Sequence, residues 1–154
     1  METSIPASVA LTILRQLQND AGLSIAELAE RVGLSQTPCW KRVKRLESEG
    51  VIRGRAVLLD QEMLGLGLTV FVTVRTNRHD AEWLEAFGSG VAALPQVVEF
   101  FRLAGEADYL LKVIVKDITA YDAFYKTLIQ VAPLADVSSS FAMERIKWTP
   151  ALPI

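Results

Sequence analysis

The hydrophobic pattern in the first third of the chain predicts three short amphipathic helices. The first begins near Ser8, whose hydroxyl is suited to capping, and the polar run 19–22 ends it. The apolar residues that share one stripe of this helix are Val9, Ile13, Leu14 and Leu17. A helix with a single apolar stripe buries that stripe against other elements, so we expect these residues in a small helical core.

A tight turn separates the second and third predicted helices. Ser24 and Glu27 have the spacing of a capping box, and Gly33 ends the second helix in a left-handed conformation that is cheap only for glycine. Ser35 then caps the third helix, and Pro38 fits its first turn because an N–H has no intrahelical partner there. Two helices joined by a glycine turn at this spacing predict a helix-turn-helix.

The third predicted helix has one apolar edge and one polar edge. At about 100° per residue, the positions that face the core are Cys39, Val43, Leu46 and Gly50. The positions on the opposite edge are Thr37, Lys41, Lys44 and Ser48. Trp40 and Arg45 lie on the two flanks, and Arg42 lies nearer the core edge. Because Trp is amphipathic, a core anchor and a groove contact are both open for the ring of Trp40.

Charge favours a DNA-binding role for this helix. The chain has a formal net charge of -2, yet residues 36–55 contain six Lys or Arg and only two Glu. A solvated basic face is the alternative interpretation, but the tight turn and the cap at Ser35 favour a helix that enters the major groove. Cations then neutralise phosphates, while Gln36, Thr37 and Lys41 reach base edges. The predicted DNA-binding residues are Ser35, Gln36, Thr37, Trp40, Lys41, Arg42, Lys44, Arg45, Arg53 and Arg55.

The last two of those residues lie in an extended stretch after the third helix. Residues 51–52 and 56–59 are apolar, and Arg53 and Arg55 alternate along the stretch. Residues 60–67, with Gly65 and Gly67, are the predicted hinge. The predicted domains are therefore residues 1–59, which bind DNA, and residues 68–154, which follow the hinge.

From Leu68 the apolar pattern changes to a period of two. Strands are predicted at residues 68–75, 97–103, 108–115 and 137–148, and helices at 83–94 and 121–128. The order βαββαβ is that of the ferredoxin-like split unit, so the fold class is α+β. In the last strand the apolar positions change register, which indicates a bulge or a strand that crosses into a neighbouring subunit.

The predicted sheet has too many apolar residues for one covered face. In the third strand Tyr109, Leu111 and Val113 share one face, whereas Leu110 and Ile114 lie on the other. Two helices cover only one face of a four-stranded sheet, so a second copy of the chain is expected on the other face. A homo-oligomer also suits a single helix-turn-helix, which contacts little DNA alone.

Composition excludes several other classes of protein. The 154 residues suffice for one domain or two small ones, and one Cys with one His leaves no disulfide or Cys/His metal cluster. The chain has no apolar run long enough for a membrane span and no secretory signal near Met1, so we expect a cytoplasmic location. His79 and Asp80 are the nearest approach to a general base, but capping explains Asp80, and no cofactor or catalytic set is expected.

Several runs of the chain resemble the Lrp/AsnC (feast/famine) transcriptional regulators. They are LAERVGLSQTPC (28–39), RLE (45–47), GVI (50–52), LGLG (64–67), AGEADYLL (104–111) and SSFAM (139–143). The resemblance implies a winged helix-turn-helix, a RAM-type C-terminal domain that dimerises and often builds octamers as tetramers of dimers, and an amino-acid effector. Two departures are Ala10, where the family has an acid, and Arg55, where the family has Tyr.

The resemblance also implies an effector pocket near the turn between the second and third strands, at a contact between dimers. The candidate effector-binding residues are Gly105, Glu106, Ala107, Asp108, Tyr109, Ser139 and Ser140. Exposed backbone N–H groups there suit a carboxylate, and Glu106 or Asp108 suits an ammonium, although an ordinary hairpin turn also explains Gly and Asp. The runs WKR (40–42) and FAME (141–144) are similar to the branch that controls L-cysteine detoxification. The alternative is an architectural DNA-binding protein without an effector.

Overall fold

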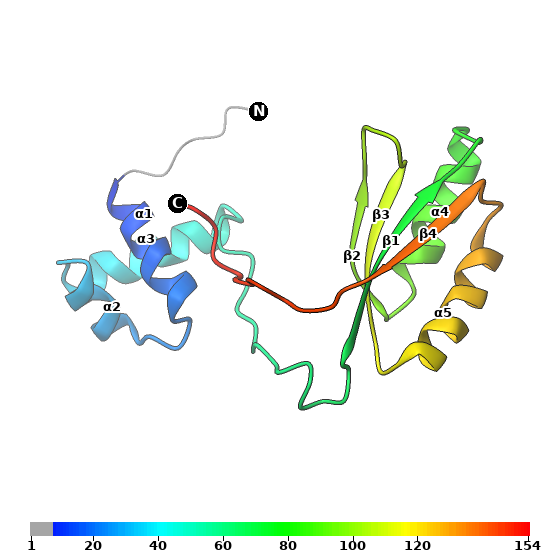
Figure 1. The fold of residues 1–154 in the computed structure, drawn as a ribbon. Coiled ribbons are helices and arrows are strands. Elements are labelled where there is room, and N and C mark those ends of the chain that lie inside the picture. Colours follow the sequence, from blue (N-terminus) through cyan, green and yellow to red (C-terminus); the bar gives the residue numbers. More distant parts are fainter. Residues whose placement is uncertain (1–7) are drawn as a thin grey trace. The chain divides into compact units, whose positions relative to one another are not determined.

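The structure, a computed structural model, describes residues 8–154 as two compact units. Within those residues, the first unit comprises 8–58 and 147–154, and the second comprises 59–146. Residues 1–7, which include the N-terminus used for the secretory prediction, lie outside the described part. Figure 1 shows the helical first unit and the sheet of the second. The predicted domain of 68–154 differs from this division, because its last eight residues group with the helices.

The first unit contains the three predicted helices. They are α1 (Ser8–Asn19), α2 (Ile25–Arg31) and α3 (Gln36–Ser48). Both halves of the capping box form: the Ser24 hydroxyl accepts from the Glu27 N–H, and the Ser24 N–H donates to the Glu27 carboxylate at 2.8 Å. Gly33 has φ +68°, and the N–H of Leu34 donates to the Ala29 carbonyl, which closes the turn between the helices. The helix-turn-helix is confirmed.

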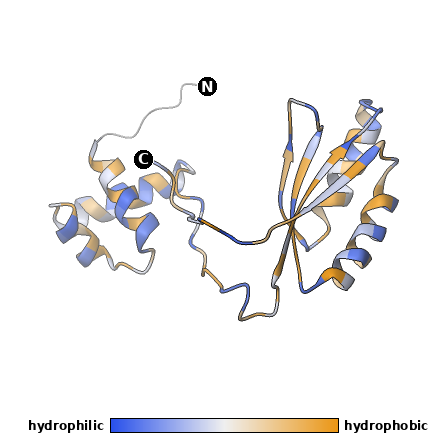
Figure 2. Cartoon of the chain, viewed as in Figure 1, coloured by the Kyte–Doolittle hydropathy of each residue, from blue (hydrophilic) through white to orange (hydrophobic). Residues whose placement is uncertain are grey.

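The core of this unit lies where the three helices meet. Its buried members are Ile13, Leu17, Leu28, Ala29, Cys39, Val43 and Leu46. Three of the four positions predicted for the apolar edge of α3 are therefore buried, but Gly50 is exposed. It lies beyond the end of α3, with φ +74°, in the turn that follows the helix. Figure 2 shows apolar and hydrophilic residues mixed along these helices, as amphipathic packing requires.

The stretch after α3 begins with a bend that packs on the helical core and then continues without a strand ladder. The N–H of Ile52 donates to the Leu46 carbonyl at 3.0 Å, and the Ile52 side chain packs against the helical core. Residues 51–58 contain no strand, and the apolar side chains of Val57, Leu58 and Leu59 are exposed. A period-two pattern forms a strand only where a neighbouring strand takes its hydrogen bonds, and within residues 8–154 none is placed beside this stretch.

The segment predicted as a hinge folds into a capped turn. Asp60 accepts hydrogen bonds from the N–H groups of Glu62 and Met63, both at 2.9 Å. Gly65 has φ +70°, and the N–H of Leu66 donates to the Gln61 carbonyl. A left-handed glycine followed by such a hydrogen bond is the usual cap at the C-terminus of a helix, and here it ends the turn. This turn belongs to the second unit.

The second unit is a four-stranded antiparallel sheet with two helices. The strands are β1 (Leu68–Arg75), β2 (Val97–Arg102), β3 (Tyr109–Val115) and β4 (Asp136–Phe141), and the helices are α4 (Ala81–Ala92) and α5 (Ile118–Val131). The strand order is β2-β3-β1-β4, which is the ferredoxin-like arrangement expected from βαββαβ (Figure 1). The predicted α+β fold class is confirmed.

Alternation along the strands places the core on one face of the sheet. Val70, Val72 and Val74 of β1 and the odd-numbered residues of β3 are buried under α4 and α5. Trp83 and Phe87 of α4 stack with ring centroids 4.8 Å apart, and Phe87 also contacts Tyr109 and Phe100. Tyr109 is thereby fixed in the core.

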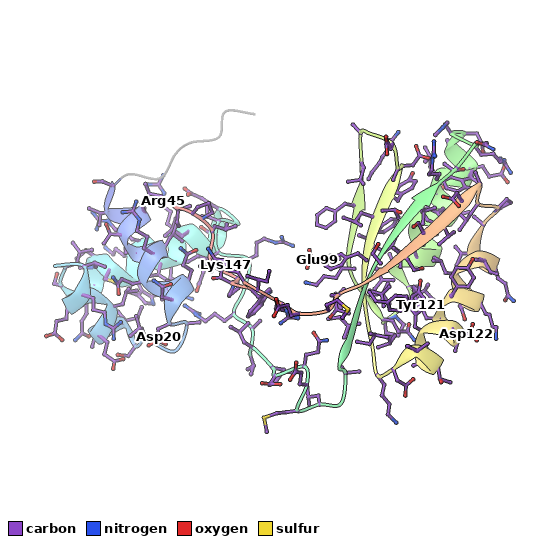
Figure 3. All side chains as sticks on the ribbon, viewed as in Figure 1. Asp20, Arg45, Glu99, Tyr121, Asp122 and Lys147 are labelled. Atoms are coloured by element: carbon purple, nitrogen blue, oxygen red, sulfur yellow. The ribbon has the colours of Figure 1, made fainter. Side chains whose placement is uncertain are left out.

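The opposite face of the sheet is less covered by the described residues, as expected for a four-stranded sheet with only two helices. Phe71, Leu110 and Ile114 lie on it, because the ladder pairs Phe71 with Lys112 and Thr73 with Leu110. Lys112 forms a 2.6 Å ion pair with Glu99 of β2 across this face, and Figure 3 labels Glu99. The half-exposed rings of Phe71 and Phe101 are available to a partner surface.

The predicted last strand of 137–148 is wrong beyond Phe141. β4 pairs with β1 in unbroken register from Asp136 to Phe141, so β4 contains no bulge. The irregularity lies in β2 instead, where the register with β3 shifts between Val97 and Glu99. The change in apolar register near Met143 marks the point where the chain leaves the sheet.

Candidate nucleic-acid interface and ligand hollow

The N-terminal turn of α3 exposes the polar residues that were predicted to contact DNA. Ser35 occupies the N-cap position, but its side chain makes no capping hydrogen bond. Gln36 and Thr37 follow it and are exposed. Unsatisfied N–H groups at a helix N-terminus favour anions, so this end of α3 is suited to a phosphate as well as to base edges.

The exposure of Trp40 decides between the two roles that the sequence left open, a core anchor and a groove contact. Trp40 is 48% exposed and follows the buried Cys39, so within the described residues Trp40 is not a core anchor. Burial raises the pKa of the Cys39 thiol, which keeps that side chain a neutral part of the core. The exposed ring lies on the same helix turn as Lys41 and adds apolar contact area to the polar edge.

Acidic neighbours hold three of the predicted DNA-binding cations. Lys44 forms an ion pair with Glu47 at 2.7 Å, and Arg55 approaches the other oxygen of the same carboxylate at 3.4 Å. Arg45, labelled in Figure 3, forms an ion pair with Glu49 at 2.6 Å. These hydrogen bonds lower the pKa of Glu47 and raise the pKa of Arg45. The sequence prediction treated all three as available cations.

The other three predicted DNA-binding cations, which are Lys41, Arg42 and Arg53, have no acidic partner among residues 8–154. Lys41 and Arg53 are exposed, and neither forms an ion pair there. Arg42 donates to the Pro38 carbonyl at 3.4 Å, within its own helix. Lys41 lies on the edge of α3 opposite the core and is exposed, so the helix presents its charge to solvent.

The second unit has a hollow of about 460 Å³ where three segments meet. Its lining residues are Arg75, Thr76, Asn77, Gly105, Glu106, Asp108, Ala135 and Asp136. They come from the end of β1, the β2–β3 turn and the start of β4, which are adjacent because β1 pairs with both β3 and β4. Three predicted effector residues, Gly105, Glu106 and Asp108, line it together.

The remaining effector candidates do not line the hollow. Ala107 is in the same turn but does not line the hollow, and Tyr109 is in the aromatic core. Ser139 faces the helices and is hydrogen-bonded to the hydroxyl of Tyr121, which Figure 3 labels on α5. Ser140 pairs opposite Phe71 on the other face of the sheet. Because successive strand residues point to opposite faces, Ser139 and Ser140 cannot share one site.

Asp108 has a structural role that the sequence prediction did not include. Its carboxylate accepts from the Thr76 N–H at 2.8 Å, and its own N–H donates to the Val74 carbonyl at 2.9 Å. These bonds fasten the start of β3 to the end of β1. Arg75, Glu106 and Asp136 have no ion pair within residues 8–154, so they supply the hollow's available charges of both signs.

The residues of the hollow that sequence reasoning missed come from β1 and β4. They are Arg75, Thr76, Asn77, Ala135 and Asp136. The predicted βαββαβ order could have found them, because it places β4 beside β1 and so brings Asp136 opposite Arg75.

Comparison with known proteins identifies the family. Residues 9–53 match the family described as winged helix-turn-helix DNA-binding, and residues 69–152 match the Lrp/AsnC ligand binding domain. The second match alone spans more than half of the chain. The chain belongs to the Lrp/AsnC family. The resemblance seen in the sequence is confirmed, and the protein is a DNA-binding transcriptional regulator of the Lrp/AsnC type.

Relatives of this Lrp/AsnC chain are regulators by name. It is 52% identical over 143 residues to the DNA-binding transcriptional activator DecR of Escherichia coli K12, covering 92% of this chain and 94% of that protein. It is 47% identical over 144 residues to the glutamate uptake regulatory protein of Zymomonas mobilis, covering 94% and 88%.

Solved structures show the same fold. An AsnC family transcriptional regulator from Agrobacterium tumefaciens is 51% identical with a TM-score of 0.93, covering 96% of this chain and 97% of that one. A transcriptional regulator from Neisseria meningitidis, solved in complex with L-Met, is 38% identical with a TM-score of 0.91, covering 97% of each chain.

The acidic and histidine side chains of the described residues have structural roles or stand apart from one another. Residues 8–154 contain no group of three or more His, Cys, Asp or Glu side chains placed to hold a metal ion. Asp80 is the N-cap of α4: it accepts from the Trp83 N–H at 3.0 Å and pairs with Arg78 at 2.9 Å. The predicted capping role is therefore confirmed. None of the helices in the described part is long and apolar enough to span a bilayer.

Proposed function

We propose that this Lrp/AsnC regulator reads duplex DNA with the exposed edge of α3. The observation that carries the proposal is Lys41, a cation without an acidic partner in residues 8–154, on the helix edge opposite the core and one turn after Gln36 and Thr37. Gln36 and Thr37 supply contacts to base edges, and the Ser35 hydroxyl, which makes no capping bond, supplies a phosphate contact. Arg53 adds charge beside the groove.

The regulator acts as a homo-oligomer in this proposal. Phe71, Phe101, Leu110 and Ile114 give the uncovered sheet face an apolar surface that a second copy can cover. A two-fold dimer then presents two α3 helices to sites about one duplex turn apart, which predicts a palindrome-like operator. Assembly of four dimers into an octamer, a cytoplasmic location and a role without catalysis complete the proposal.

The hollow is the proposed effector site. An amino acid carries a carboxylate and an ammonium, and the hollow offers the Arg75 guanidinium together with the Glu106 and Asp136 carboxylates. Because these groups lie at an exposed edge of the second unit, a neighbouring dimer can close the site. An effector that binds one assembly more tightly than another shifts the balance between them, and so changes DNA binding. L-Cysteine is the first amino acid to test.

Selection of binding sequences from a pool of randomised duplexes tests the DNA-binding proposal. The expected product is a palindrome-like consensus, and footprinting on it should protect two half-sites on one face of the duplex. The variant that combines Lys41→Ala and Arg45→Ala should weaken binding and flatten its dependence on salt concentration. Unaltered affinity in that variant would contradict the placement of α3 in the groove.

A thermal-shift screen with the twenty amino acids tests the effector proposal. A ligand that binds the folded protein at 100 times its Kd stabilises it by about 2.7 kcal/mol, which raises the melting temperature. The shift should disappear in Arg75→Ala but persist in Arg102→Ala, an exposed arginine outside the lining of the hollow. No shift with any amino acid, and no change in oligomer size, would favour an architectural DNA-binding protein without an effector.

A further inference from the structure

Glu47 joins two parts of the DNA-binding surface. It lies on α3, and its two carboxylate oxygens contact two cations: Oε2 receives Lys44 at 2.7 Å, and Oε1 faces Arg55 at 3.4 Å. Lys44 is three residues before it on the same helix, whereas Arg55 is eight residues after it, in the stretch that follows α3. One carboxylate therefore connects the helix to that stretch.

Little else in residues 8–154 fixes the position of Arg55. The last backbone hydrogen bond between this stretch and α3 is the one from Ile52 to Leu46, and residues 53–58 are exposed and without a strand partner. Glu47 itself is only 26% exposed, so it is better shielded from water than either cation. The hydrogen bond from Lys44 lowers the pKa of Glu47, so this contact favours the charged carboxylate.

We propose that Glu47 is a positioning residue that holds Lys44 and Arg55 as a fixed pair and reduces binding to DNA of unrelated sequence. The proposal rests on the DNA-binding role of α3. An unrestrained Lys or Arg contacts any phosphate in reach, because backbone contacts carry no sequence information. A pair held by one carboxylate carries a net charge of +1 instead of +2, and it meets phosphates only when the helix is in its docked position.

This inference predicts weaker sequence discrimination when the carboxylate is removed. In Glu47→Gln the side chain keeps its size and helix propensity, but the net charge of the group rises from +1 to +2, and Lys44 and Arg55 are no longer held by a carboxylate. One additional counterion is then released from DNA, which steepens the slope of log K against log salt concentration by about 0.9. Affinity for a random-sequence duplex should rise about fivefold at about 0.1 M salt, while affinity for the selected sequence changes less.

The experiment measures fluorescence anisotropy of labelled duplexes at several KCl concentrations, with the full chain. The matched control is Glu30→Gln, which removes the same charge from an exposed residue of α2 that has no ion pair within residues 8–154. Far-UV circular dichroism and a melting curve establish that each variant is folded. We expect the steeper slope in Glu47→Gln and a smaller change in Glu30→Gln.

A variant that lacks both cations tests whether Glu47 acts by holding Lys44 and Arg55 or only through its own negative charge. In a chain carrying Lys44→Ala and Arg55→Ala, replacing Glu47 should leave the salt slope unchanged if Glu47 acts through those two cations. The same steepening in both backgrounds, or equal slopes for Glu47→Gln and Glu30→Gln, would overturn the proposal. If the wild-type chain binds neither duplex, the proposed function fails first, and that result is distinct from these.

Discussion

Gln18 and Leu152 exchange two hydrogen bonds although 134 residues separate them in the chain. The Gln18 amide donates to the Leu152 carbonyl at 3.0 Å, and its oxygen accepts from the Leu152 N–H, also at 3.0 Å. Arg15, one turn earlier on α1, donates to the Ile154 carbonyl at 2.8 Å. The segment 147–154, which begins at Lys147 in Figure 3, is thereby part of the DNA-binding unit.

Replacing Gln18 should therefore loosen the first unit. Gln18→Ala removes both hydrogen bonds to Leu152, and the expected loss is about 1 kcal/mol because both groups are partly solvated in the folded state. Hydrogen exchange should speed up in α1 and at Leu152. Gln16→Ala, on the same helix and without a side-chain hydrogen bond in residues 8–154, is the control. Equal exchange in the two variants would contradict a structural role for the segment.

This contact shows where prediction from the sequence stops. The helices and β1 to β3 could be predicted because their apolar periodicity reflects burial inside one unit. Residues 146–148 also alternate, yet they form no strand, because alternation does not specify whether a partner strand is present. Contacts between segments as distant as Gln18 and Leu152 leave no local pattern, so the domain assignment of 147–154 could not be predicted.

The aromatic core of the second unit should be sensitive to a cavity. Phe87 is fully buried between Trp83, Tyr109 and Phe100, so Phe87→Ala should cost about 3–5 kcal/mol. Ile118→Ala, at an exposed position at the start of α5, should cost far less. Urea unfolding measures both values, and a loss below about 1 kcal/mol for Phe87→Ala would contradict this packing.

Asp108 gives a test that separates structure from ligand binding. In Asp108→Ala the buried Thr76 N–H loses its acceptor, and stability should fall by about 1–3 kcal/mol. Asp108→Asn keeps an acceptor oxygen and should recover most of that loss. If it also keeps amino-acid binding in calorimetry, the charge of Asp108 is not required by the ligand. Equal destabilisation by Ala and Asn would show that the carboxylate charge itself holds the turn.

Asp80 should make stability depend on pH in the acid range. The hydrogen bond from Arg78, and then the one from the Trp83 N–H, lower the pKa of Asp80 from 3.8. A lowered folded-state pKa contributes stability above pH 3.8 that is lost as the pH falls through the folded-state value. The difference in unfolding free energy between wild type and Asp80→Asn should therefore be larger at about pH 6 than at about pH 3. A constant difference would exclude this linkage.

The candidate sites could be predicted only in part, for identifiable reasons. Helical angles placed Lys41 and Lys44 on one edge, but they could not place Arg55, which lies outside the helix, beside the carboxylate of Glu47. The β2–β3 turn could be predicted as one wall of a pocket. Arg75 and Asp136 could be placed in that pocket only by using the strand order, which sets β4 beside β1. Ser139 and Ser140 were grouped because they are adjacent in sequence, although adjacent strand residues face opposite sides.

The central claim is that the exposed edge of α3 binds DNA, and Lys41 tests it most directly. Lys41→Ala removes one cation from that edge without breaking an ion pair in residues 8–154, and Lys116→Ala removes an exposed cation from the second unit as the control. Anisotropy titrations with the selected duplex should show a salt slope about 0.9 shallower for Lys41→Ala and no change for Lys116→Ala. Identical slopes in wild type and Lys41→Ala would contradict the account.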